Sequence, residues 1–109
     1  MFTLPTKLIQ LRNNNHLREI LDNNPKVILD FSTDWCPPCR VMEGTIANLT
    51  FELEGKAIVV KVDPEKFKDI ADQYKIKGIP YFVGVIDNIE SGRAHGIVPI
   101  QQLKNMINE

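Results

Sequence analysis

The chain has 109 residues, of which 43% are hydrophobic and 25% charged, with 13 basic and 14 acidic side chains and a formal net charge of -1. These proportions exclude a wholly disordered, collagen-like or coiled-coil chain, and the length suits a single domain over residues 1–109. The balanced charge predicts no binding to nucleic acid or anionic lipid. No apolar run is long enough to cross a bilayer, and Met1 to Gln10 lack the pattern of a secretory signal.

In the first half of the chain, apolar residues alternate between strand-like and helix-like patterns. Residues 8–11 predict a first strand, and the helical spacing that follows ends at Asn23-Asn24-Pro25. Residues 27–31 are apolar except for one carboxylate, which is typical of a strand covered on both faces of a parallel sheet. A long helix is expected after residue 39, ending near Gly55, with an apolar face of Met42, Ile46, Leu49 and Leu53.

The second half predicts a hairpin between two helices. Residues 57–62 form a strand-like run, after which Asp63 is expected to cap a helix with Pro64 in its first turn. The run 81–86 predicts a strand, in which Gly84 indicates a bulge or a close backbone contact. A turn at Asp87-Asn88, an antiparallel edge strand over 90–95 and a closing helix near Pro99 follow. This order predicts an α/β fold, a mixed sheet with helices on both faces.

The chain has only two cysteines, Cys36 and Cys39, in the run Trp-Cys-Pro-Pro-Cys. A disulfide that closes so short a loop restrains little of the unfolded chain and would be a weak structural link. Two thiols cannot supply a four-thiolate zinc site, neither histidine has zinc-finger spacing to them, and Arg40 excludes the covalent-haem pattern. We therefore predict no metal and a pair that exchanges electrons as thiols and disulfide. Two unreactive structural thiols are the alternative.

The positions of the two cysteines predict different roles for them. Cys36 is expected to be exposed at the start of the helix, where unpaired N–H groups and the helix dipole favour a thiolate and Arg40 adds a cation. Cys39 lies about one turn inside the helix and is expected to be more buried. We therefore expect Cys36 to attack a substrate disulfide and Cys39 to resolve the resulting mixed disulfide.

Four segments together resemble the thioredoxin family, almost from end to end of the chain. They are the run from Asp30 to Arg40, the strand segment 60–63, the approach 74–80 to a proline, and Gly96 before the last helix. Their joint order and spacing are more specific than any one of them. The resemblance implies a thioredoxin-like fold, a five-stranded mixed sheet in the order 1-3-2-4-5 flanked by four helices.

The resemblance also implies a base for the resolving step. Asp30 would be a buried carboxylate beneath the active site that accepts the proton of Cys39, and Lys61 would be its partner and tune its pKa. Burial raises the pKa of a carboxyl group, so this role is physically sound. A tolerated polar residue near a strand end is the alternative for Asp30.

A substrate-binding rim is implied by the same resemblance. Pro80 would follow a cis peptide bond and bring its loop against the thiols. Ile79 would offer backbone hydrogen bonds to an extended substrate peptide. Trp35, Ile79, Pro80 and Gly96 would together form a flat apolar rim, with Trp35 exposed rather than in the core.

Several residues depart from the family pattern. Pro37 stands where a glycine is usual, which removes one possible N–H donor near the thiolate. Gly44 stands where a helix-kinking proline is usual. Tyr81 follows Pro80 where a threonine is usual, and His95 occupies a rim position that is commonly apolar. We expect His95 to be an ordinary exposed histidine; the alternative is that it shifts substrate preference or adds pH dependence.

These observations predict a cytoplasmic, monomeric protein-disulfide reductase. It would act on disulfide-containing client proteins, be recharged by a thioredoxin reductase, and need no cofactor because the two sulfurs carry the electrons. A thiol-disulfide oxidase or isomerase of an oxidising compartment is one alternative. A non-catalytic thioredoxin-fold module that binds partners is the other.

Overall fold

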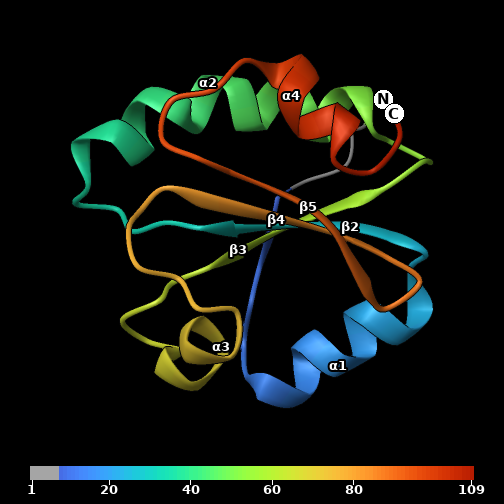
Figure 1. The fold of residues 1–109 in the computed structure, drawn as a ribbon, viewed down its shortest axis with the longest axis horizontal. Coiled ribbons are helices and arrows are strands. Elements are labelled where there is room, and N and C mark those ends of the chain that lie inside the picture. Colours follow the sequence, from blue (N-terminus) through green and yellow to red (C-terminus); the bar gives the residue numbers. More distant parts are fainter. Residues whose placement is uncertain (1–7) are drawn as a thin grey trace, which may run out of the picture.

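A five-stranded sheet with the strand order β1-β3-β2-β4-β5 forms the centre of the molecule (Figure 1). The computed structural model describes residues 8–109, so the sequence interpretation of residues 1–7 lies outside the described residues. The strands are β1 (Ile9–Gln10), β2 (Lys26–Phe31), β3 (Ile58–Val62), β4 (Tyr81–Ile86) and β5 (Ile89–His95). β2 pairs parallel with β3 and antiparallel with β4, which places it in the middle of the sheet. The mixed sheet confirms the predicted fold class.

Within residues 8–109, four helices cover the two faces of this sheet. They are α1 (Asn14–Asn23), α2 (Pro37–Glu52), α3 (Lys68–Gln73) and α4 (Ile100–Asn105). Figure 1 shows α2 and α4 over one face and α1 and α3 over the other. No helix of residues 8–109 is long and apolar enough to cross a membrane.

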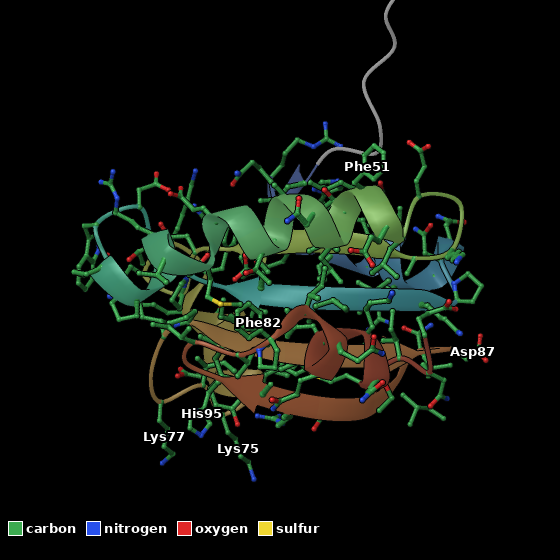
Figure 2. All side chains as sticks on the ribbon, turned by 90° about the horizontal axis from the view of Figure 1, so that it is seen from above. Phe51, Lys75, Lys77, Phe82, Asp87 and His95 are labelled. Carbon is green, nitrogen blue, oxygen red and sulfur yellow. The ribbon has the colours of Figure 1, made fainter. Side chains whose placement is uncertain are left out.

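Successive residues of β2 point to opposite faces and so contribute to two separate cores. Leu29 belongs to the cluster under α1 and α3, and Ile28 belongs to the cluster under α2 and α4. Both side chains are fully buried. Figure 2 shows this side of the sheet from above, with the buried Phe82 between α2 and α4 and the exposed Phe51 on α2. Because β2 is covered on both sides, its sequence is almost wholly apolar.

The hairpin between β4 and β5 agrees with the sequence prediction. Asp87 and Asn88 form its turn with positive φ angles of 50° and 66°. The pairing of the two strands shifts register between Gly84 and Val85, which is the predicted bulge. A Cβ atom on Gly84 would lie 3.0 Å from the Cβ of Met106, so the predicted close contact is also present.

The start of the third helix differs from the prediction. Asp63 caps a turn, in which its Oδ1 accepts hydrogen bonds from the N–H groups of Glu65 (2.9 Å) and Lys66 (3.3 Å). The helix α3 begins only at Lys68, and its N-cap, Phe67, makes no side-chain cap hydrogen bond. The Asp-Pro signal was therefore correct for a capped turn and wrong for the helix boundary, because an aspartate can cap either structure.

Candidate functional site

The two cysteines lie where the central strand β2 passes into α2. Cys36 is the N-cap residue of α2, and its Sγ accepts a hydrogen bond from the backbone N–H of Cys39 at 3.3 Å. Pro37 and Pro38 occupy the first helical positions, where a missing N–H group removes no helical hydrogen bond. Both cysteines are free thiols. The local sequence thus holds one sulfur at the helix N-terminus and the other one turn inside, as expected.

The predicted difference in exposure is not present. Cys36 is 4% exposed and Cys39 is 6% exposed, so the expectation of an exposed Cys36 was wrong. The reason is tertiary: the thiol of Cys36 turns inward to cap α2 and points at the carbonyl oxygen of Ile79, with an Sγ–O distance of 3.9 Å. The loop before β4 therefore covers a sulfur that the helix position alone would leave open.

The environment of Cys39 strongly favours its protonated form. Burial raises the pKa of the Cys39 thiol to about 12, helped by its hydrogen bond with Cys36 and by the charges of Cys36 and Asp30. A thiol with this pKa carries almost no thiolate at neutral pH. Cys39 therefore needs a base before it can act as a nucleophile.

A buried carboxyl group lies close to this thiol. Asp30, on β2, is 4% exposed. Burial raises its pKa from 3.8 to about 6, against the opposing effects of a hydrogen bond from Ser32 and the charge of Lys61. Its Oδ1 atom has no hydrogen-bond partner among the described residues. The predicted rise in pKa is confirmed, and an acceptor with a pKa near neutrality is suited to take up a proton.

Lys61 has a different direct partner from the one expected. It lies beside Asp30 in the register of β3 and β2, but its ammonium group forms an ion pair with Asp34. Lys61 acts on Asp30 through its charge, which lowers the pKa of that carboxyl. The sequence analysis missed Asp34 because it lies in a loop, where no periodic pattern shows which way a side chain points.

A cavity of about 390 Å³ connects these groups with the surface. Asp30, Cys39 and Lys61 all line it, and Asp34 and Glu43 lie at the same cavity. The buried Oγ1 of Thr33, another lining residue, has no partner among residues 8–109. Sequence reasoning missed Thr33 as well. The cavity brings Asp30 within reach of solvent, and both polar side chains, such as Thr33, and apolar ones, such as Met42, line it.

The four residues of the predicted rim differ in their surroundings. Trp35 is 64% exposed, as expected, and its Nε1 donates a hydrogen bond to Glu65 at 3.2 Å. The bond between Ile79 and Pro80 is cis, which confirms that expectation. Gly96 has a φ of 76° and donates its N–H to the carbonyl oxygen of Pro80 at 2.9 Å.

Three of the four rim residues surround an open hollow of about 310 Å³ rather than a flat surface. Ile79, Pro80 and Gly96 line this hollow, together with Gly78, Tyr81 and His95. Trp35 is not among its lining residues. His95 is exposed, as expected, and its ring stacks on Tyr81 with a centroid distance of 5.7 Å.

Comparison with known proteins gives a consistent result. Residues 7–109 match the family described as Thioredoxin. Thioredoxin-1 of Drosophila melanogaster is 34% identical over 80 residues, which cover 73% of this chain and 75% of that protein. Thioredoxin-like protein CITRX2, chloroplastic, of Nicotiana benthamiana is 34% identical over 89 residues. The matched residues make up 80% of this chain but only 49%, about half, of the length of that relative. The crystal structure of Schistosoma mansoni thioredoxin has a TM-score of 0.81, 31% identity and 94% of each chain covered.

Proposed function

Since the chain belongs to the thioredoxin family, we propose that it reduces disulfide bonds of client proteins through Cys36 and Cys39. Family membership and two thiols three residues apart make it a thiol-disulfide oxidoreductase. The direction of the reaction, the clients and the roles of single residues are parts of the proposal. The observation that carries it is the pair itself: one sulfur caps α2, and the other has a pKa of about 12 beside a carboxyl group with a pKa of about 6.

In the first half of the reaction, Cys36 is the nucleophile. Its thiolate attacks one sulfur of the client disulfide, a mixed disulfide forms, and the other client sulfur leaves as a thiolate that takes up a proton. The N–H groups at the start of α2 stabilise negative charge on Cys36, and the hydrogen bond from Cys39 N–H is one of them. Because Cys36 is covered by the loop at Ile79, this loop has to make room for the client sulfur.

In the second half, Cys39 releases the client. Asp30 accepts the proton of Cys39, whose sulfur attacks Cys36 and forms the intramolecular disulfide while the second client sulfur leaves reduced. Two electrons have moved to the client and the Cys36–Cys39 pair is oxidised. Lys61 keeps the pKa of Asp30 lower than burial alone would set it.

The client segment docks at the loop that contains the cis bond. The backbone of Ile79 binds an extended segment of the client by strand-like hydrogen bonds. Trp35 and Gly96 provide contact surface around it, and the buried Pro80 supports the loop from below. The distance of 3.9 Å between Cys36 Sγ and the carbonyl oxygen of Ile79 supports this docking mode, because a client segment bound at Ile79 would have its sulfur close to Cys36.

A separate thioredoxin reductase returns the electrons, and no further cofactor is needed because the two sulfurs carry them. We place the protein in the cytoplasm as a monomer. A reducing couple is consistent with that compartment, whereas an oxidase would need a strongly oxidising one.

The reduction potential of the Cys36–Cys39 couple tests this proposal. The protein is equilibrated with glutathione buffers of graded composition, and the oxidised fraction is measured after acid quenching and thiol labelling. Thioredoxin has a potential of roughly −270 mV, a value that we carry over from the family, and strong oxidants lie near roughly −120 mV. We expect a value near the first. A value near the second would replace the reductase by the oxidase alternative.

A further inference from the structure

A hollow for a client side chain lies next to the reactive sulfur. The hollow of about 310 Å³ is open to solvent, and Ile79, whose carbonyl oxygen faces Cys36 at 3.9 Å, is one of its lining residues. A client segment whose sulfur reaches Cys36 therefore passes this hollow within a few residues, because an extended chain advances about 3.3 Å per residue.

The wall of the hollow is a fixed stack of side chains. Tyr81 of β4 pairs with His95 of β5, and their rings stack at an interplanar angle of 27°. Arg93 lies two residues before His95, on the same face of β5, with its guanidinium carbon 5.6 Å from the centre of the Tyr81 ring. Glu90 holds Arg93 by two hydrogen bonds of 2.6 and 2.9 Å. The charge of Glu90 is thereby paired, and this wall has no net negative charge.

Two lysines extend from the loop beside this wall. Lys75 and Lys77 lie between α3 and β4, and both are exposed. Figure 2 shows their side chains and that of His95 projecting from the same side of the molecule. Within residues 8–109, neither ammonium group forms an ion pair. The chain as a whole has a net charge of -1, so these two positive charges are opposite in sign to the net charge of the protein.

We propose that Lys75 and Lys77 select client segments that carry an aspartate or glutamate near the reacting cysteine. The client carboxylate lies over the hollow, where its charge attracts both ammonium groups and where the docked segment reduces screening by water. This inference rests on the proposed function and adds a substrate class to it. The lysines act on docking and on formation of the mixed disulfide, whereas release of the client depends on Cys39.

The test uses two synthetic peptides, each with one internal disulfide, that differ only in a Glu or a Gln two residues from the attacked cysteine. Stopped-flow fluorescence of the exposed Trp35 gives the second-order rate constant for oxidation of the reduced protein. We expect the Glu peptide to react about two- to thirtyfold faster at low salt, the range for two exposed charge pairs. The ratio should approach one in about 1 M salt, where the screening length is about 3 Å.

Charge-removing variants assign the effect to these residues. In the double variant Lys75→Gln, Lys77→Gln the ratio of the two rate constants should fall to about one. Lys56→Gln is the matched control, since Lys56 is an exposed lysine beyond the opposite end of α2 from Cys36, and it should keep the ratio of the parent. Circular dichroism establishes that each variant is folded.

Equal rates for the two peptides with the parent protein would overturn this inference and leave the proposed function intact. A Glu preference that survives loss of both lysines would overturn it as well. If the parent reduced neither peptide, the proposed function would fail, and the inference that depends on it would fail too.

Discussion

At the scale of single residues, the two thiols are almost equally exposed but have different surroundings. Burial is the largest cause of the raised pKa of Cys39, but its hydrogen bond with Cys36 and the charge of Cys36 also contribute. The contribution of the Cys36 charge ends when Cys36 Sγ is bonded to a client sulfur, since that sulfur then carries no negative charge. The pKa of Cys39 therefore falls at the step at which Cys39 has to ionise.

Trapping of clients should distinguish the two cysteines. In Cys39→Ser, Cys36 can still attack but nothing resolves the product, so mixed disulfides with client proteins should accumulate. In Cys36→Ser, burial still raises the pKa of the remaining thiol, so few adducts should form. Non-reducing gel electrophoresis after incubation with a disulfide-containing client measures both. Equal trapping by the two variants would contradict the assignment of roles.

Replacement of Asp30 should slow one half-reaction and stabilise the fold. Asp30→Asn keeps the shape but cannot accept a proton, so the mixed disulfide should form at a near-normal rate and resolve slowly. The pKa of Asp30 is raised from 3.8 to about 6, so the folded protein holds this proton more tightly than the unfolded chain does. Ionisation of the buried carboxyl therefore costs about 3 kcal/mol of stability above about pH 6.

The stability gain of Asp30→Asn should depend on pH in a defined direction. The gain should be near its maximum at about pH 7.5 and should decrease as the pH falls through the range from 6 to 3.8. Below pH 3.8 the gain should be small, because the protonated aspartic acid and the asparagine are both neutral. Urea melts of parent and variant at both ends of this range, beside rapid-mixing kinetics, measure the two effects. Unchanged resolution, or a large loss of stability at neutral pH, would show that Asp30 is a structural residue and not the base.

At the scale of elements, α2 and the β4–β5 hairpin hold the site in place through contacts of different kinds. α2 directs its N-terminus at Cys36 and packs one face into the core. Gly44 lies in the exposed middle of this helix, and a Cβ atom added there would meet no other atom within 4 Å. The hairpin, by contrast, lies close against the C-terminal residues. Gly84 leaves 3.0 Å between the position of a Cβ atom and Met106, and Ser91 donates a hydrogen bond to the Met106 carbonyl at 2.6 Å.

Two glycine substitutions should therefore change stability in opposite directions. Gly44→Ala removes backbone freedom in a helix interior and should raise the free energy of unfolding by up to about 1 kcal/mol. Gly84→Ala forces the hairpin away from Met106 and should lower it by about 1–3 kcal/mol. Chemical denaturation of the two variants beside the parent gives both values. A destabilised Gly44→Ala would mean that α2 needs its glycine for a reason other than packing.

At the scale of the whole molecule, the central strand joins two cores that have no side chains in common. Leu29 and Ile28 are neighbours in sequence, but they support opposite faces of the sheet. Neither core is complete without β2, because each is bounded by the sheet on one side and by two helices on the other (Figure 1). The two layers should therefore unfold together.

Truncation on either face should show this coupling. Leu29→Ala and Ile28→Ala should each lower the free energy of unfolding by about 2–5 kcal/mol, since both side chains are fully buried. Ile89→Ala, at a residue that is 71% exposed, is the control and should change it by less than about 0.5 kcal/mol. Circular dichroism and Trp35 fluorescence should follow one transition in each variant. Separate transitions for the two probes would contradict a single cooperative unit.

The amino-acid sequence by itself determined the order of elements, the bulge region at Gly84 and the pairing of two thiols at a strand-to-helix junction. These features follow from periodicity, turn residues and spacing, which act over a few residues of chain. It also showed one carboxylate, Asp30, within an apolar run, but only the resemblance to a family implied a role for that carboxylate. The resemblance to a family added the strand order and the cis bond before Pro80, both of which are present.

Only the tertiary structure decided how these parts meet. The loop at Ile79 covers Cys36, Lys61 pairs with Asp34 rather than directly with Asp30, and Lys75 and Lys77 project from the same side of the molecule as His95, which lines the hollow. Each of these facts joins residues from different elements. A local pattern shows which face of an element is buried, but the partner of a side chain depends on how the elements pack, and that is set by the summed burial of both cores rather than by any one segment.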